Sequence, residues 1–247
     1  MSDPHVMITG ASSGLGAELA ARFRKQRWNV TGTTHEIKST FGTDLMLYDA
    51  TAYGAPNALV TSMMGLEGRA KGPVNVLINN AGINAIRRFE DLTLEFMEEV
   101  MRVNCHAPVL LIKELLGAQL FAPQPVIVNV ISDAAWRPMR HSAAYGQSKA
   151  AFDMATRQMA RELTKPHDLI MVGIRPGKMK GTGMSTYIDQ QVCDLRGWTP
   201  EEAHAYFVQN SVTGREQSPH DVARLIYDLV ENPLITTMSG ACIDLVG

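Results

Sequence analysis

Residues 9–16 read Thr9-Gly10-Ala11-Ser12-Ser13-Gly14-Leu15-Gly16 and stand between a β-rich run at residues 5–9 and a helical pattern at residues 15–26. Glycine permits a sharp turn and a close approach of the backbone to a ligand, while the free N–H groups of a helix N-terminus stabilise phosphate charge. Packing alone is a poor explanation for three glycines at one strand-to-helix junction. The stretch therefore predicts a dinucleotide-binding turn that opens a βαβ unit.

Short β-rich runs and longer helical patterns continue to alternate after this turn. We expect strands at residues 5–9, 28–33, 44–48, 74–78, 125–130, 169–174 and 241–246, and helices at 15–26, 56–66, 93–120 with a break near the middle, and 144–163. Nearly continuous apolar runs such as VNVLI and PVIVNV are typical of parallel strands buried on both faces. The pattern predicts the α/β class, with a doubly wound, seven-stranded parallel sheet (a Rossmann fold) in a single domain over residues 1–247.

Two late helices have strong start signals, at Thr199-Pro200 and at Ser218-Pro219, where a hydroxyl residue precedes proline and an acid follows. The stretch between Gly177 and Thr199 has no clear periodicity. A long irregular segment in a compact domain is more often functional than a linker. We expect a substrate lid over about residues 178–215.

Composition limits the partners. The chain has 247 residues, 45% of them hydrophobic, with 23 Lys and Arg against 25 Asp and Glu. Because no basic run is present, we expect neither nucleic acid nor a membrane surface as partner. Charged residues make up only 19%, below the roughly 25% of ordinary domains, which favours burial of surface between subunits. We expect a homodimer or homotetramer.

The three cysteines, Cys105, Cys193 and Cys242, are odd in number and widely spaced, so they predict neither disulfides nor a C-x-x-C site. The first β-rich run begins before a signal peptide would fit, and no apolar stretch approaches the roughly 18 residues of a membrane span. These features favour a cytoplasmic protein. The seven histidines have no ligand spacing, so we expect no metal site.

Residues 10–14 also satisfy G-x-S-x-G, the nucleophile elbow of serine hydrolases. An elbow serine is presented by a preceding sheet and needs an acid and a histidine later in the chain. Here the motif follows the first strand. Hydrolase is therefore the weaker hypothesis.

Tyr145 and Lys149 lie four residues apart near the start of a predicted helix, so they share one face. An ammonium close to a phenol lowers the pKa of the phenol, and Tyr145 would then exchange protons near neutral pH. The alternative is an exposed pair worth only about 0.3–0.5 kcal/mol. The spacing alone does not decide between them.

Two further polar residues occupy suggestive positions. Ser132 follows strand 125–130, at the edge where open α/β sheets bind ligands, although serine and Asp133 after a strand also suit a turn. Asn104 lies four residues before Pro108, which has no N–H to donate, so a kink and a free carbonyl are expected. That carbonyl would hold a water in a proton path from Tyr145 through the cofactor ribose and Lys149; the alternative is an ordinary proline kink.

Taken together, these residues resemble the short-chain dehydrogenases/reductases, in the single-domain branch that includes ketoacyl reductases. The resemblance covers essentially the whole chain. Its motifs occur in family order: Thr9-Gly10-x-x-x-Gly14-x-Gly16, Asp49, Asn79-Asn80-Ala81-Gly82, Asn104, Ser132, Tyr145-x-x-x-Lys149 and Pro176-Gly177.

The resemblance implies a role for each catalytic position. Tyr145 would be the general acid/base, Ser132 the ligand of the substrate oxygen, Lys149 the ribose ligand and tyrosine activator, and Asn104 the anchor of the proton relay. The implied cofactor-binding residues are Gly10, Ser12, Ser13, Gly14, Leu15, Gly16, Thr34, His35, Asp49, Asn80, Ala81, Gly82, Tyr145, Lys149, Pro176, Gly177 and Thr182.

This chain departs from the family at three places. Residues 35–48 are too few for the usual helix between the second and third strands, so we expect it to be missing or reduced. Gly181 stands where the family often has a nicotinamide-contacting threonine, and Thr182 is the nearest substitute. Strand 125–130 is followed by ISD and not by two serines, but Ser132 keeps the family's separation from Tyr145.

The implied activity is hydride transfer between a nicotinamide cofactor and a carbonyl or secondary alcohol of a small molecule. The alternative is a cofactor-binding regulator without turnover, since fold alone does not establish catalysis. Substrate specificity is expected in segments 83–88, 134–143 and 178–215. Within the second segment, Trp136 and His141 are candidate substrate contacts beside Ser132.

The end of the second strand favours NADP(H), with NAD(H) possible. NAD-preferring sites place an acid there, which accepts from the ribose 2′-hydroxyl and repels a 2′-phosphate. Thr34 occupies that position here, as in NADPH-dependent ketoacyl reductases. Ser13 stands where NADP-preferring relatives often have arginine or lysine, so His35 or Lys38 would have to bind the phosphate.

Overall fold

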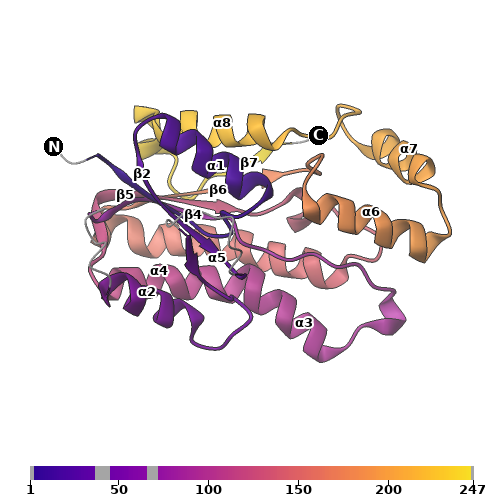
Figure 1. Ribbon diagram of the computed structural model, residues 1–247, viewed down its shortest axis with the longest axis horizontal. Helices are drawn as coiled ribbons and strands as arrows, with labels where there is room; N and C mark the ends of the chain where they lie inside the picture. The colour runs from indigo at the N-terminus through magenta and orange to yellow at the C-terminus, as the bar shows by residue number, and fades with distance from the viewer. Residues whose placement is uncertain (1–2, 37–44, 66–71, 246–247) are drawn as a thin grey trace.

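The computed structural model describes residues 3–36, 45–65 and 72–245. In these ranges seven parallel strands form one sheet in the order β3-β2-β1-β4-β5-β6-β7 (Figure 1). The strands are β1 (His5–Ile8), β2 (Asn29–Thr34), β3 (Leu45–Leu47), β4 (Val74–Asn79), β5 (Phe121–Val130), β6 (Ile170–Pro176) and β7 (Cys242–Leu245). The predicted doubly wound sheet is confirmed.

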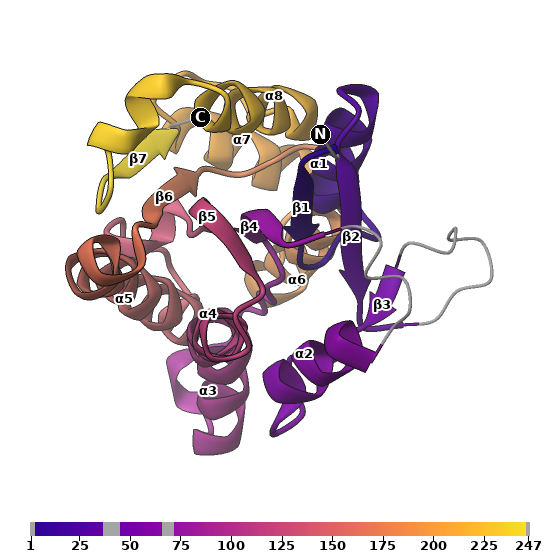
Figure 2. The same ribbon diagram turned by 90° about the vertical axis from the view of Figure 1, so that its left-hand side faces the viewer.

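Helices cover both faces of this sheet, as Figure 2 shows. On one face lie α1 (Gly14–Lys25) and α8 (Pro219–Val230), and on the other lie α2 (Ala55–Gly65), α4 (Ala107–Gly117) and α5 (Ala143–His167). Successive residues of a strand point to opposite faces, so Ile8 packs in the core beneath α1 and α8 while Met7 packs beneath α2 and α4. Burying such a side chain fully stabilises the fold by about 1.5–3 kcal/mol.

The long helical stretch expected at residues 93–120 is broken near its middle, as predicted. It consists of α3 (Leu94–Met101), a π-helical segment η3 (Arg102–His106) and α4. Pro108, the second residue of α4, lacks an N–H and so cannot donate a regular helical hydrogen bond to the carbonyl of residue 104. Short π-helical segments often occur at functional sites. Here the segment contains Asn104.

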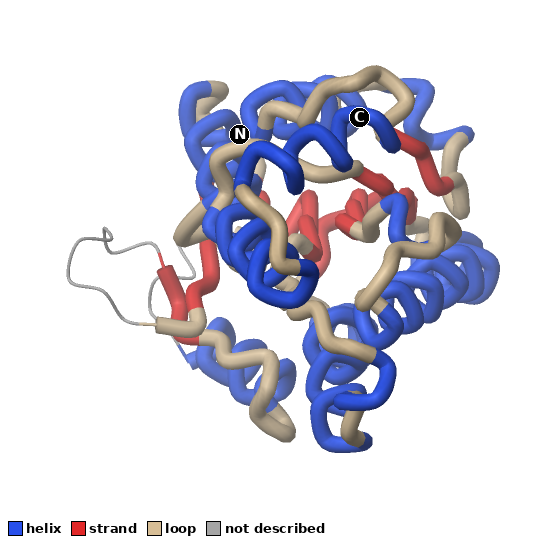
Figure 3. The backbone as a smooth tube through the Cα atoms, turned by 90° about the vertical axis from the view of Figure 1, so that its right-hand side faces the viewer, coloured by secondary structure: helices blue, strands red, loops and turns tan. Residues whose placement is uncertain are grey.

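The region after β6 differs from the sequence-based expectation. Residues 178–198 are not irregular: they contain α6 (Gly183–Arg196), which is followed by α7 (Pro200–Asn210). The predicted helix starts at Thr199 and Ser218 are correct, and Thr199 forms a full capping box with Glu202. Figure 3 views the molecule from the side that α6 and α7 occupy, where helices stand in front of the sheet.

The remaining helices are short 3₁₀ segments, namely η2 (Phe89–Asp91), η4 (Asp133–Ala135) and η5 (Pro233–Thr237). The prediction of a missing helix between β2 and β3 depends on residues 37–44, which lie outside the described residues. In the part of the chain that the structure describes, no helix is long and apolar enough to cross a membrane.

The strand order has a functional consequence. From β1 the sheet extends to β2 on one side and to β4 on the other, so the chain reverses its winding at this point. In open α/β sheets, ligands bind beyond the carboxyl ends of the strands at such a switch point. The turn at residues 9–16 lies there, between β1 and α1.

Candidate active site

A cleft of about 510 Å³ opens at this switch point. It brings together most of the site residues expected from the sequence. Those that line it are Gly10, Ser12, Ser13, Gly14, Leu15, His35, Asn80, Ala81, Gly82, Ser132, Tyr145, Lys149, Pro176, Gly177 and Thr182. Those that do not are Gly16, Thr34, Asp49, Asn104, Trp136 and His141.

The glycines of the turn are there for two different physical reasons. Gly10 and Gly14 have φ of 67° and 51°, a left-handed conformation that other residues rarely adopt. At Gly16 the limit is space, because an added Cβ would lie 2.0 Å from the carbonyl oxygen of Gly10. The turn can form only with these glycines. It leaves the N-terminus of α1 exposed to the cleft, as a pyrophosphate-binding turn requires.

Thr9 holds the turn against the loop after β4. Its hydroxyl accepts hydrogen bonds from the backbone N–H groups of Asn80 and Ala81, both at 3.0 Å. In return, the Asn80 side-chain amide donates to the carbonyls of Thr9, at 3.0 Å, and Gly10, at 3.2 Å. Two segments 70 residues apart are thus fixed in one geometry. An open, rigid cradle of this shape fits a dinucleotide.

Tyr145 and Ser132 meet on the opposite wall of the cleft. Tyr145 comes from the first turn of α5, and Ser132 follows β5 and begins η4. Burial raises the pKa of Tyr145 to about 12, against a hydrogen bond with Ser132 that lowers it. The phenol is therefore protonated at neutral pH in the ligand-free protein, and this proton is available to an oxygen bound beside Ser132.

Lys149 is buried one helical turn beyond Tyr145. Its ammonium donates to the carbonyl of Val130 at 3.1 Å and lies 5.8 Å from the centre of the tyrosine ring. Burial lowers the pKa of Lys149 to about 8. The expected depression of the tyrosine pKa by this cation does not occur in the ligand-free chain, because desolvation of Tyr145 is the larger effect.

Asn104 lies outside the cleft and supports it from behind. Its side chain accepts from the Ile83 N–H and donates to the Ile83 carbonyl, both at 2.9 Å, and also donates to the Ser148 hydroxyl at 3.0 Å. Ser148 in turn donates to the carbonyl of Tyr145 at 2.8 Å. Asn104 therefore links η3 to the loop after β4 and to the helix that bears the tyrosine.

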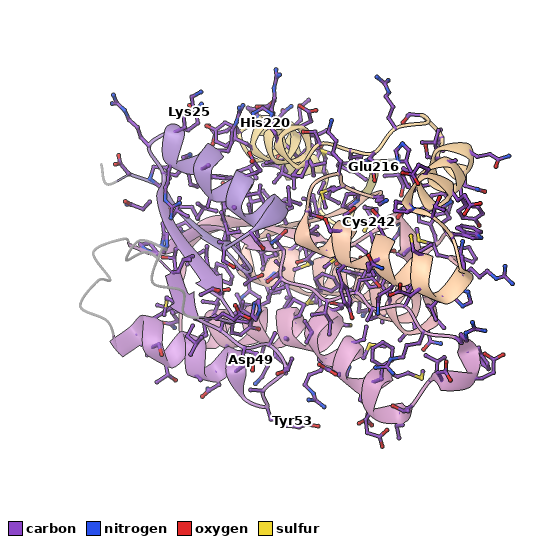
Figure 4. All side chains as sticks on the ribbon, turned by 45° about the vertical axis from the view of Figure 1, so that its right-hand side comes forward. Lys25, Asp49, Tyr53, Glu216, His220 and Cys242 are labelled. Carbon is purple, nitrogen blue, oxygen red and sulfur yellow. The ribbon has the colours of Figure 1, made fainter. Side chains whose placement is uncertain are left out.

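The end of β2 contains an acid that the sequence analysis did not weigh. Thr34 is buried and its hydroxyl donates to the carbonyl of Glu36 at 2.9 Å. His35 reaches the cleft, and its Nε2 lies 3.6 Å from a Glu36 carboxylate oxygen. Lys38 lies outside the described residues. Asp49 accepts instead from the hydroxyl and N–H of Thr51, near the start of α2 (Figure 4).

The two proposed substrate contacts in segment 134–143 do not reach the cleft. Trp136 is 55% exposed, and its ring N–H donates to Asp244 at 2.8 Å. His141 lines a neighbouring hollow on the outer side of the same segment. The structure therefore does not bring either side chain to Tyr145.

Thr182 lies against the glycine turn. It caps the N-terminus of α6 by accepting from the Ser185 N–H at 3.1 Å. An added Cβ at Gly14 would lie 3.5 Å from its methyl group. The N-terminus of α6 thus faces the same cleft as the N-terminus of α1.

The sequence analysis expected substrate contacts in residues 178–215 but did not name the side chains that line the substrate side of the cleft there. One face of α6 supplies Met184, Ile188 and Val192, and α7 supplies Tyr206 and Phe207. The spacing of four residues within α6 is the signal that would have found it. Lining residues outside the expected set also include Asn84, Asp133, Arg137, Arg140, Lys178, Asp189 and Arg196.

Asp133 is the most unusual of these additions. It is 5% exposed and accepts from Ser132 at 3.2 Å, with Arg137 3.9 Å away. Burial raises its pKa, and its charge contributes to the raised pKa of Tyr145. Among the residues described, no group of three His, Cys, Asp or Glu side chains is placed to hold a metal ion.

Comparison with known proteins gives consistent matches. The family model described as short chain dehydrogenase matches residues 4–192. The chain is 26% identical over 245 residues to the short-chain dehydrogenase/reductase FrzI of Cladobotryum sp, covering 93% of this chain and 89% of that protein. It is 27% identical over 248 residues to D-erythrulose reductase of Gallus gallus, covering 96% and 93%. A solved structure of an actinorhodin polyketide ketoreductase variant with NADPH has a TM-score of 0.88 at 24% identity, covering 100% of this chain and 98% of that one.

Proposed function

This chain belongs to the short-chain dehydrogenase family and is an NAD(P)-dependent oxidoreductase of carbonyl and alcohol groups, in which we propose that Tyr145 is the proton donor and acceptor. The observation that carries this proposal is the shared cleft, which is lined by Tyr145, Ser132 and Lys149 and by the glycine turn. Nothing observed favours a regulator without turnover.

The residues of this chain divide the chemistry between them. Ser132 and Tyr145 bind the carbonyl oxygen, and in the reductive direction the proton moves from Tyr145 Oη to that oxygen. The nicotinamide, when bound, supplies the hydride that the carbonyl carbon accepts. Because burial raises the pKa of Tyr145 to about 12, the donor is fully protonated at neutral pH. Lys149, with a pKa near 8, is mostly cationic there and binds the ribose hydroxyls.

The direct test is an assay of carbonyls and secondary alcohols with both nicotinamide cofactors, followed by nicotinamide absorbance. Turnover with at least one pair is expected. A protein that binds the cofactor tightly but turns over no member of a broad panel would favour the regulator instead.

Within this activity the chain prefers NADP(H). Support comes from the end of β2, where Thr34 supplies no carboxylate to repel a 2′-phosphate and His35 lines the cleft. Glu36 works against this preference, and one of its carboxylate oxygens lies 3.6 Å from His35 Nε2.

Fluorescence titration with NADPH and NADH measures this preference. We expect tighter binding of NADPH, and a reversal in Thr34→Asp. Thr213→Asp adds the same charge at an exposed position outside the cleft and should leave the ratio unchanged. Tighter binding of NADH by the unmodified protein would contradict the proposal.

We also infer a lid, α6 with α7 within residues 178–215, that covers the substrate. Lys178 forms two ion pairs where the lid begins. Its ammonium lies 2.6 Å from Asp189 of α6 and 2.8 Å from Glu216, and Figure 4 labels Glu216 on the side of α6 and α7. The Arg137 guanidinium donates to the Asn210 carbonyl at the end of α7. These contacts join the lid to both walls of the cleft.

Self-association as a dimer or tetramer is a further part of the proposal. Besides the low charged fraction, α4 and α5 expose apolar side chains, with Leu110 44% and Met154 63% accessible. Light scattering at micromolar concentration is the test, and a monomer would refute it.

Cys105, Cys193 and Cys242 are unpaired thiols, in keeping with a cytoplasmic location that cell fractionation would test.

A further inference from the structure

The end of the cleft that lies under α6 and α7 contains an excess of positive charge. Lys178, Arg137, Arg140 and Arg196 all line the cleft. Two of them have acidic partners: Lys178 with Asp189 and Glu216, and Arg137 with Asp133 at 3.9 Å. In the described part of the chain, Arg140 and Arg196 have no hydrogen bond or ion pair.

Arg196 is held in position without being neutralised. Its guanidinium carbon lies 4.6 Å from the ring centre of Trp198 and 4.9 Å from that of Tyr206. Its Nε is buried and makes no hydrogen bond within the described residues. Stacking on aromatic rings fixes the plane of a guanidinium and leaves its N–H edge available to an anion.

The surroundings of His141 show that these cations are grouped. The pKa of His141 is lowered by burial and then by the charges of Arg196, Arg140 and Arg88, against Glu90 alone. Arg88 donates to the carbonyl of Leu195, next to Arg196, at 3.1 Å. Three guanidinium groups thus lie near one another with one acid among them.

Between this cationic end and Tyr145 the wall formed by α6 and α7 is largely apolar, and its acid, Asp189, is paired with Lys178. Met184, Ile188 and Val192 line it from α6, and Phe207 lines it from α7. A substrate that spans the cleft therefore meets first the hydroxyls of Tyr145 and Ser132, then an apolar wall, and finally guanidinium groups. Planar N–H donors of this kind bind carboxylates and phosphates, often through two hydrogen bonds.

We propose that the substrate is an anionic ketone, in which an apolar segment joins the reacting carbonyl to a carboxylate or phosphate that Arg140 and Arg196 bind. This inference rests on the proposed function, because it assigns the substrate class of the same cleft. It makes Arg140 and Arg196 specificity-determining residues and gives them no part in proton or hydride transfer.

Matched pairs of ketones test the proposal. Levulinate and its longer homologues are compared with their methyl esters, which lack the negative charge and carry one more methyl group at that end. For the best chain length we expect kcat/KM to favour the acid by about tenfold or more, because a charge-assisted hydrogen bond is worth more than 1.4 kcal/mol. The phosphate ester of a hydroxyketone of that length then distinguishes a phosphate site from a carboxylate site.

The variants separate specificity from catalysis. Arg196→Gln and Arg140→Gln should each reduce the preference for the acid over the ester by several fold, mainly through a higher KM for the acid. Arg161→Gln removes the same charge from the exposed surface of α5 and should have no effect. Equal rates for acid and ester in the unmodified protein, or an undiminished preference in Arg140→Gln/Arg196→Gln, would overturn the proposal.

A binding measurement does not depend on turnover. Trp198 stacks on Arg196, so its emission should change when an anion binds there, and Trp28→Phe/Trp136→Phe isolates it among the three tryptophans. Levulinate should give a saturable change that its ester does not, weakened by salt and lost in Arg196→Gln. If Trp198 responds while no carbonyl is reduced, the proposed function fails and the anion site stands. If ketones are reduced, but Trp198 emission does not change with levulinate and the acid is not preferred over the ester, the proposed substrate class is wrong.

Discussion

Replacing Lys149 by methionine should stabilise the ligand-free protein while it removes activity. Burial lowers the pKa of Lys149 from its ordinary 10.5 to about 8. Since a tenfold change in an equilibrium constant is about 1.4 kcal/mol, keeping this ammonium charged costs on the order of 3 kcal/mol at neutral pH. Methionine avoids that cost but leaves the Val130 carbonyl without its donor, which offsets about 1 kcal/mol. We expect a net gain of about 1–2 kcal/mol in the free energy of unfolding.

The lowered pKa of Lys149 also predicts how the free energy of unfolding changes with pH. Between about pH 8 and 10.5 the unfolded lysine binds more protons than the folded one, so stability rises with pH in that window. Tyr145 acts in the opposite sense, because its raised pKa makes stability fall from about pH 10 toward 12. Burial also raises the thiol pKa values of Cys105 and Cys242, so stability falls with these groups from about pH 9. Measurements between about pH 8 and 9 therefore isolate the lysine.

Denaturant unfolding of the ligand-free protein at several pH values is the assay. The unmodified protein should become more stable as the pH rises above 8, and Lys149→Met should lack this rise. Lys165→Met, on the exposed surface of the same helix, is the matched control and should keep it. If Lys149→Met is less stable than the unmodified protein at pH 7, or if both share one pH profile, the reasoning from burial is refuted.

Two further substitutions test the frame of the cleft. Gly16→Ala should destabilise the protein by about 1–3 kcal/mol and abolish dinucleotide binding, because the added Cβ would lie 2.0 Å from the Gly10 carbonyl oxygen. The control is Gly117→Ala in α4, where an added Cβ meets no atom within 4 Å. In denaturant unfolding this control should be neutral or stabilising. Asn104→Ala removes three hydrogen bonds of 2.9–3.0 Å and should lower both stability, by about 1–3 kcal/mol, and kcat, whereas Asn57→Ala removes one exposed bond and should change neither. If Gly16→Ala and Gly117→Ala had equal effects on stability and activity, the role given to Gly16 would be contradicted. Equal effects of Asn104→Ala and Asn57→Ala would contradict the role given to Asn104.

The glycine turn and the catalytic residues were predictable because each has a local cause. Positive φ at Gly10 and Gly14 allows few residue types, and Pro108 has no N–H to donate to the carbonyl of residue 104. Such constraints appear in the sequence itself. They fixed the positions of β1, α1 and the break at Asn104 before any tertiary contact was known.

The pKa of Tyr145 was not predictable in this way. Helical spacing places Lys149 on the same face, but it gives no information about burial. In the folded chain desolvation outweighs the effect of the cation, and the ammonium is directed to Val130. The family expectation for the pKa of Tyr145 refers to a protein with the cofactor ribose bound. In the ligand-free protein the pKa of Tyr145 depends on how the side chain is packed, which the sequence does not show.

A lid was expected over about residues 178–215, but its helix α6 was missed because the apolar side chains of α6 face the cleft and not the sheet. Met184, Ile188 and Val192 form a stripe one residue wide, which is narrower than the stripe of a core-facing helix. Trp136 shows the reverse error. It is close to Ser132 in the sequence, yet its side chain turns outward to Asp244.

The most direct test of the account is the activity of Tyr145→Phe. Removing one hydroxyl group takes away the transferable proton and leaves the ring, the helix and the glycine turn in place. We expect the variant still to bind the cofactor and kcat to fall by about 10²–10⁴-fold, the usual contribution of general acid catalysis. Tyr53→Phe, at a tyrosine 85% exposed, should leave kcat unchanged. A Tyr145→Phe protein that reduces its ketone at a near-normal rate would contradict the assignment of Tyr145 as proton donor.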